Sequence, residues 1–149
     1  MAIFLGKYNI KPYHSMKYFQ FKKLVRDKIV DNMKEEKQEP KGVRILKDKE
    51  YLKELKMKLI EEVKEFEVVT NEEEMVEELA DVQEVIEYIK KVLKIKDIDF
   101  EKYQKKKVQK SGGFKKRIYL ESVGIKEDSK WFKYFQKNPD KYPPIEKPE

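Results

Sequence analysis

Apolar residues recur every three or four positions over two long stretches of the chain, the spacing of one face of a helix. The first stretch covers about residues 49–69, and its apolar stripe is Leu52, Leu55, Leu59, Val63 and Phe66. The second begins at Thr70 or Asn71, each of which has a glutamate three residues later, as in a capping box. Its stripe is Met75, Leu79, Val82, Ile86, Ile89 and Leu93. The pattern predicts two long helices that form an antiparallel hairpin, with Asp48 as the cap of the first.

Shorter patterns flank the predicted hairpin. Residues 25–36 are expected to form a short helix that ends before Pro40 and Gly42, because these residue types interrupt helices. A further helix is predicted over residues 100–110, and the Gly112–Gly113 pair is expected to end it. The fold class predicted from these elements is all-α.

The same pattern divides the chain into three parts. Residues 1–21 are aromatic and irregular and are expected to be an N-terminal extension, residues 22–120 form the helical domain, and residues 121–149 read as a tail. Aromatic residues around Trp131 are expected to dock this tail on the core or on a neighbouring subunit. A hairpin with short flanking helices buries little surface, so we expect an oligomeric helical bundle, a homodimer or a homotetramer.

Composition narrows the class of protein. The chain has 149 residues, 39% of them apolar and 43% charged, which suits one small domain. It has no cysteine, which excludes disulfides, thiolate catalysis and cysteine-ligated zinc. The N-terminus lacks the features of a signal peptide, and no run approaches the ~18 apolar residues that span a bilayer. We therefore expect a soluble, cytoplasmic protein with no membrane association.

Charge is distributed unevenly along the predicted hairpin. The whole chain carries a net charge of +6, yet residues 59–87 contain twelve acidic residues and one lysine, a local balance of −11. Taking 100° per residue, Glu62 and Glu65 lie beside the first stripe, and Glu78 and Asp81 lie on the same rotational side of the second. The two pairs also lie at matched distances from the turn. Antiparallel packing would therefore bring all four carboxylates to one side of the hairpin.

Four neighbouring carboxylates repel one another, and the usual remedies are protonation or a bound cation. Oxygen ligands favour hard ions, so Mg²⁺ is the expected ion and Mn²⁺ the alternative. The competing interpretation is that these acids are simply the solvated flank of two helices.

Four segments carry a resemblance to a known family. The stretches "EEVKE" (residues 61–65) and "EELAD" (77–81) resemble the EExxE and ExxD motifs of the all-α, MazG-like nucleoside triphosphate pyrophosphatases. "KLVRDKI" (23–29) and "KSGGFKKRIYLE" (110–121) are similar to the opening and closing segments of a small subfamily that is described as phosphoribosyl-ATP pyrophosphohydrolase-like. The chain departs from that pattern at Ser111, where a basic residue is expected.

The resemblance implies a reaction and roles for five residues. Glu62, Glu65, Glu78 and Asp81 would hold Mg²⁺, and Glu61 would orient the attacking water as a base whose proton affinity is raised by like-charged neighbours. The implied reaction is hydrolysis of a ribo- or deoxyribonucleoside triphosphate between the α and β phosphates, which gives a nucleoside monophosphate and pyrophosphate.

Basic residues could bind the rest of the triphosphate. Residues 102–117 contain eight lysines and arginines and no acid, and we select Lys107, Lys110 and Arg117 as candidate phosphate ligands. Arg26 and Lys28 in "KLVRDKI" are comparable candidates. The competing interpretation for these basic side chains is a network of surface ion pairs.

Three other functions remain open at this point. Phosphoribosyl-ATP hydrolysis is the nearest alternative within the enzyme class. A nucleic-acid-binding protein would use the basic stretch, but the acidic hairpin would repel a phosphate backbone, so nucleic acid is a less favoured partner. A helical scaffold would explain the amphipathic helices and leave the arrangement of acids to chance.

Overall fold

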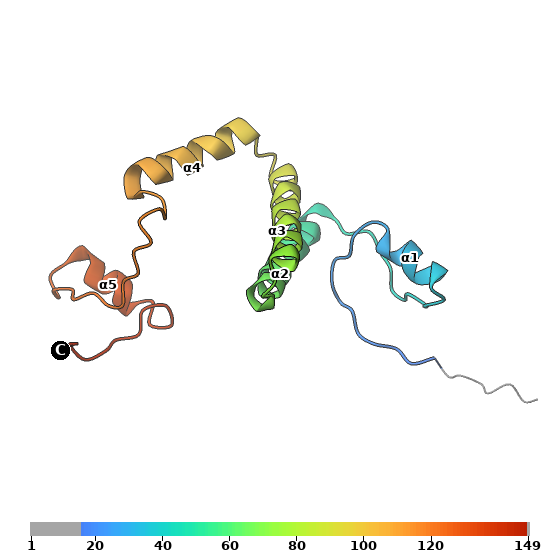
Figure 1. Ribbon diagram of the computed structural model, residues 1–149, viewed down its shortest axis with the longest axis horizontal. Helices are drawn as coiled ribbons and strands as arrows, with labels where there is room; N and C mark the ends of the chain where they lie inside the picture. The colour runs from blue at the N-terminus through green and yellow to red at the C-terminus, as the bar shows by residue number, and fades with distance from the viewer. Residues whose placement is uncertain (1–15, 149) are drawn as a thin grey trace, which may run out of the picture. The chain divides into compact units, whose positions relative to one another are not determined.

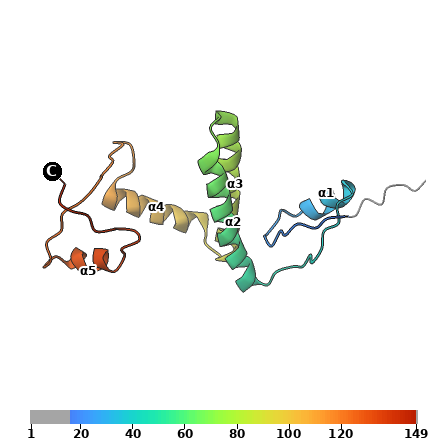
Figure 2. The same ribbon diagram turned by 90° about the horizontal axis from the view of Figure 1, so that it is seen from below.

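The computed structural model describes residues 16–148. This part of the chain contains five helices and no strand (Figure 1, Figure 2). The helices are α1 (Ile29–Glu35), α2 (Asp48–Val68), α3 (Glu72–Val92), α4 (Asp97–Ser111) and α5 (Lys130–Gln136). The predicted all-α class is therefore confirmed over the described residues. None of these helices combines the length and the apolar character needed to cross a bilayer.

The chain divides into two units. The first unit ends at Phe100 and contains α1, α2, α3 and the first residues of α4. The second unit begins at Glu101 and contains the rest of α4 together with α5. The helical domain predicted over residues 22–120 has parts in both units. Of the predicted N-terminal extension, residues 1–15 lie outside the described residues.

The two long helices begin and end close to the positions predicted from their apolar stripes. The side chain of Asn71 caps α3, accepting a hydrogen bond from the backbone N–H of Glu74 at 2.9 Å. This confirms Asn71 rather than Thr70 as the start of the second helix. The expected cap of α2 is wrong by one residue, because Lys47 holds the cap position and Asp48 is already helical. Its carboxylate is still favourable in the first helical turn.

Helices α2 and α3 pack against each other, and residues 69–71 connect them. Both views show the two helices side by side (Figure 1, Figure 2). Among the described residues, Leu55 and Val85 are the buried apolar side chains, with exposed fractions of 3% and 7%. Leu55 belongs to the predicted stripe of α2, whereas Val85 lies outside the predicted stripe of α3. Members of the two stripes such as Val63 and Leu79 remain about half exposed. A single chain therefore leaves much of the apolar face uncovered.

A buried lysine connects the end of α3 to the start of α4. Lys90 is 8% exposed, and its ammonium lies 2.6 Å from the carboxylate of Asp97 and within hydrogen-bonding distance of Glu87. The same ammonium lies 5.0 Å from the ring centroid of Phe100. These contacts explain why α4 begins at Asp97, earlier than the predicted residue 100. Its predicted end is confirmed: the N–H of Gly112, which has a φ of +78°, donates to the carbonyl of Val108.

The shorter helices differ more from the prediction. Helix α1 begins at Ile29 rather than at residue 25. Residues 25–28 lie outside the helix, and Arg26 among them pairs with Asp81 of α3. Helix α5 falls in the stretch expected to be a tail. Ser129 caps it by accepting from the N–H of Trp131, and the ring of Phe135 lies 4.4 Å from that of Tyr142. Both contacts are local and leave no long apolar stripe in the sequence.

Candidate metal site

Three carboxylates from the two long helices meet on one side of the pair. Glu62 of α2 and Glu78 and Asp81 of α3 each place one oxygen so that the three oxygens lie within 4.8 Å of one another. Their helical spacing puts Glu78 and Asp81 on the same face of α3, three residues apart. The structure thus brings together three of the four residues predicted to hold a metal. We call Glu62, Glu78 and Asp81 the acidic triad.

The environment of the triad fits a cation. The side chain of Glu62 is 3% exposed, and its Oε2 atom is buried without a hydrogen-bond partner. The Oε2 atom of Glu78 is likewise buried and accepts no hydrogen bond. Buried acceptors normally find a donor, water or ion, and carboxylate oxygens are the ligands that Mg²⁺ and Mn²⁺ prefer. The three carboxylates could therefore hold a divalent cation, and the identity of that cation stays a prediction.

The charges of the triad raise the pKa of neighbouring carboxyl groups. Loss of solvation raises the pKa of Glu78, and the negative charges of Glu62 and Asp81 raise it further. Glu65, the fourth predicted ligand, is exposed and lies outside the triad. The pKa of its carboxyl is also raised, first by loss of solvation and then by the charge and proximity of Glu62. Glu65 is therefore close enough to feel the triad electrostatically.

A lysine that was not among the predicted site residues lies against the triad. The ammonium of Lys58 lies 2.7 Å from Glu62 and 3.2 Å from Glu61, and its side chain is only 18% exposed. Burial lowers the pKa of Lys58, but the two carboxylates outweigh that effect and the pKa is raised. The sequence indicates this contact, because Lys58 precedes Glu62 by four residues, the spacing at which side chains meet on a helix.

Glu61 differs electrostatically from what was expected. Burial raises the pKa of this carboxyl, but contacts with Lys23, at 2.7 Å, and with Lys58 lower it by more, so the pKa lies below its ordinary value. The expected rise in the proton affinity of Glu61 is therefore wrong, because two ammonium groups rather than carboxylates dominate its surroundings. Its role as the residue that orients water stays a prediction.

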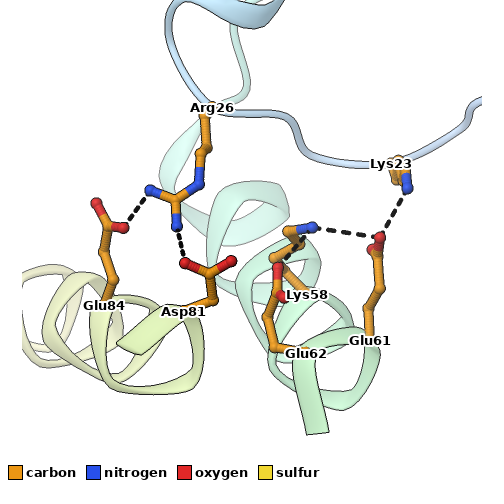
Figure 3. Close-up of polar contacts among 7 residues, drawn as sticks. All are labelled: Lys23, Arg26, Lys58, Glu61, Glu62, Asp81 and Glu84. Atoms are coloured by element: carbon orange, nitrogen blue, oxygen red, sulfur yellow. Dashed lines mark hydrogen bonds and ion pairs between the residues drawn. The ribbon is translucent and has the colours of Figure 1, made fainter. Parts of the chain in front are cut away.

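Residues 22–28, which we call the strap, run from the α2 side of the acids to the α3 side (Figure 3). The Nη2 atom of Arg26 donates to Asp81 at 2.6 Å, and its Nη1 atom donates to Glu84. Contact with Glu84 is the largest of the effects that raise the pKa of Arg26, and the charges of Asp81 and Glu84 add to it. Figure 3 shows Arg26 above α3 and Lys23 above α2. One predicted phosphate ligand, Arg26, is thus held by one carboxylate of the triad and by one carboxylate beside it.

The other predicted phosphate ligands lie elsewhere. Lys28 is exposed at the N-cap position of α1 and makes no side-chain capping bond. Lys107 and Lys110 are exposed on α4, and Arg117 is exposed in the segment after it with a φ of +54°. These last three belong to the second unit, and their contact with phosphate stays a prediction.

An open groove with a volume of about 460 Å³ adjoins the acidic side. The strap lines it on one side and the outer face of α2 lines it on the other. The lining residues are Lys22, Lys23, Leu24, Lys53, Glu54, Met57, Lys58, Ile60, Glu61 and Lys64. Five of them are lysines, and Lys58 and Glu61 also contact the acids described above. The lysines in the lining favour a ligand that carries negative charge.

Comparison of the chain with protein-family models, with curated proteins and with solved structures found no match in any of the three.

Proposed function

We propose that the chain is a divalent-cation-dependent nucleoside triphosphate pyrophosphohydrolase of the MazG-like type. The observation that carries the proposal is the pair of buried, unpaired oxygens on Glu62 and Glu78, directly beside Asp81. A helix flank that served only solubility would expose such oxygens to water. The reaction class comes from the resemblance of the motifs around these residues to those of the MazG-like family. The cluster of carboxylates and the cations beside it support a site for a metal ion and a phosphate.

The triad would hold the ion, and Glu65 is proposed as a further carboxylate of the same set. When bound, Mg²⁺ or Mn²⁺ would polarise the phosphoryl group, lower the pKa of a bound water and neutralise negative charge on the leaving pyrophosphate. Water adds to the α-phosphorus, the bond from that phosphorus to the bridging oxygen breaks, and the products are nucleoside monophosphate and pyrophosphate. Glu61, whose pKa is lowered, stays ionised near neutral pH and would orient the water by accepting its hydrogen bond.

The cations around the triad would bind the phosphates. Lys23 and Lys58 line the adjoining groove, and Arg26 lies above Asp81. Two or more positively charged donors are the usual complement to a triphosphate, because a metal ion alone leaves part of its charge uncompensated. We propose the same role for Lys28, Lys107, Lys110 and Arg117. The apolar side chains of Met57 and Ile60 in the groove offer a surface for the uncharged part of the nucleotide.

The assembly proposed for this function is an oligomer. We propose that α2 and α3 form the antiparallel hairpin of a helical bundle that a second copy completes, as a homodimer or homotetramer in the cytoplasm. Support comes from the half-exposed Val63 and Leu79 and from the small buried core, since exposed apolar faces of this kind usually mark an interface.

The test is product analysis with a panel of ribo- and deoxyribonucleoside triphosphates and phosphoribosyl-ATP, each with Mg²⁺ or with a chelator. We expect monophosphate and pyrophosphate from the native protein, dependence on the metal, and loss of turnover in Glu62→Gln. The control is Glu67→Gln, which removes one charge from an exposed glutamate of the same helix and should leave turnover unchanged. Preference for phosphoribosyl-ATP would assign the alternative substrate, whereas orthophosphate alone or no product would overturn the proposal.

A further inference from the structure

Arg26 and the proposed divalent ion have a ligand in common. The guanidinium spans two carboxylates that are three residues apart on α3, donating to Asp81 at 2.6 Å and also to Glu84 (Figure 3). Asp81 belongs to the acidic triad, and Glu84 does not. The side chain of Arg26 is 49% exposed, so it can leave this position without disrupting a packed core. One carboxylate of the triad is therefore engaged by a displaceable cation.

The strap brings a second cation to the same acids. Lys23 contacts Glu61 at 2.7 Å with a side chain that is 42% exposed. Both ion pairs join residues far apart in the sequence, and both anchor the strap to the two long helices. A strap held by half-exposed ion pairs is bound weakly, since pairs of this kind contribute little net stability. Its position over the acids thus depends on the charge that they carry.

We propose that Arg26 is an electrostatic clasp that competes with the divalent ion for Asp81 and, once displaced, binds a phosphate of the substrate. This inference rests on the proposed function. A divalent ion draws carboxylate oxygens to about 2.1 Å and repels a guanidinium held by the same carboxylate. The freed guanidinium keeps its paired donors, and this geometry suits a phosphate as well as it suits two carboxylates.

If Arg26 instead oriented Asp81 for the metal, replacing Arg26 would change the metal affinity in the opposite direction. Groups that hydrogen-bond to a metal ligand often orient it, and removing such a group weakens metal binding by roughly 10–100-fold. Removing a competing clasp tightens it. The sign of the change in metal affinity therefore separates competition from support, and it does so without any measurement of turnover.

The experiment is a calorimetric titration of the full chain with Mn²⁺ alone. We expect Arg26→Gln to bind Mn²⁺ about tenfold more tightly than the native protein. The effect is modest because the removed charge lies at a half-exposed site, where solvent screens its repulsion of the ion. Arg26→Lys retains the charge and should stay close to the native affinity. The matched control is Arg44→Gln, because Arg44 makes a similar two-pronged pair with Glu50, which is not part of the triad, and should change nothing.

A second titration tests the other half of the inference, with pyrophosphate as the probe and Mn²⁺ at saturation. Here Arg26→Gln should bind about tenfold more weakly than the native protein, because the phosphate loses a paired donor. Opposite signs in the two titrations support the clasp. Unchanged or weaker Mn²⁺ binding in Arg26→Gln, with normal binding by the native protein, overturns the clasp and leaves the proposed function standing. No Mn²⁺ binding by the native protein overturns both. Circular dichroism verifies that each variant is folded.

Discussion

Replacing Lys58 with methionine would remove the ammonium that contacts Glu62 while keeping an unbranched side chain of similar length. Glu62 is 3% exposed and the Lys58 side chain 18% exposed, so the pair is largely withdrawn from water. Breaking a buried pair by deleting one partner costs about 3–5 kcal/mol, because the remaining charge is left uncompensated. Since Lys58 keeps some contact with solvent, we expect the free energy of unfolding to fall by about 3 kcal/mol in the absence of divalent ions.

A divalent ion should restore most of that loss. At a concentration 100 times its dissociation constant, a ligand that binds only the folded state stabilises it by about 2.7 kcal/mol. The ion would also take over the compensation of Glu62 from the missing ammonium, so Lys58→Met should gain more from Mn²⁺ than the native protein gains. The assay is urea unfolding followed by circular dichroism, with Mn²⁺ or with a chelator.

The control for this prediction is Lys56→Met, which removes an exposed lysine from the same helix and should change stability by less than about 0.5 kcal/mol. An equal loss of stability in Lys58→Met with and without Mn²⁺ would mean that the lysine is a structural ion pair unrelated to a cation site. No loss in either condition would refute the inference that the ammonium compensates the Glu62 carboxylate.

Three further predictions concern the surroundings of the site and the helices that carry it. The folded state raises the pKa of Glu78 above its ordinary value of 4.5. The protonated carboxyl therefore favours folding at pH below 4.5, and this contribution to stability is lost as the pH rises through the raised pKa. Glu78→Gln should therefore become progressively more stable than the native protein as pH rises above 4.5. Unfolding of both proteins in the presence of a chelator, measured at several pH values, checks this, and a difference in stability that does not change with pH would contradict it. Leu55→Ala should lower the free energy of unfolding by about 2–5 kcal/mol, since Leu55 is 3% exposed; a change under 1 kcal/mol in urea unfolding would place the core elsewhere. Asn71→Ala should cost about 1 kcal/mol by removing the cap on the Glu74 N–H, whereas Asn71→Asp should cost little, and thermal unfolding compares the two.

The long helices were predictable because their signals are local. The spacing of apolar residues indicates where each long helix runs, and Asn71 with Glu74 indicates where α3 begins. The stripe did not identify the buried residue of α3, because Val85 lies outside it while Leu79 is half exposed. Helix α5 was not predicted because the contacts seen at its ends, with Ser129 before it and Tyr142 after it, leave no stripe in the sequence. A helix of seven residues is also too short to show a clear apolar period.

Site residues that lie on the helices could be predicted from the sequence, whereas contacts between distant segments could not. Glu62, Glu78 and Asp81 could be found because helical geometry fixes their faces once the two stripes pack. Lys58 could have been found by the same rule, since it precedes Glu62 by four residues. The partners of Arg26 could not, because they depend on the path of the strap, which is not helical and crosses both long helices (Figure 3). Contacts between residues 26 and 81 leave no periodic signal in one sequence.

The acids of the site fall into two groups according to what compensates them. Glu61 is held by two lysines and has a lowered pKa, so the chain's own cations already neutralise it. Glu78 has a raised pKa and a buried oxygen without a hydrogen-bond partner, so its charge is poorly compensated within the chain. An added cation gains most where compensation is weakest, which favours the α3 side of the triad. Asp81 lies between these cases, because Arg26 neutralises it from a half-exposed position, and it is there that a divalent ion and the strap would compete.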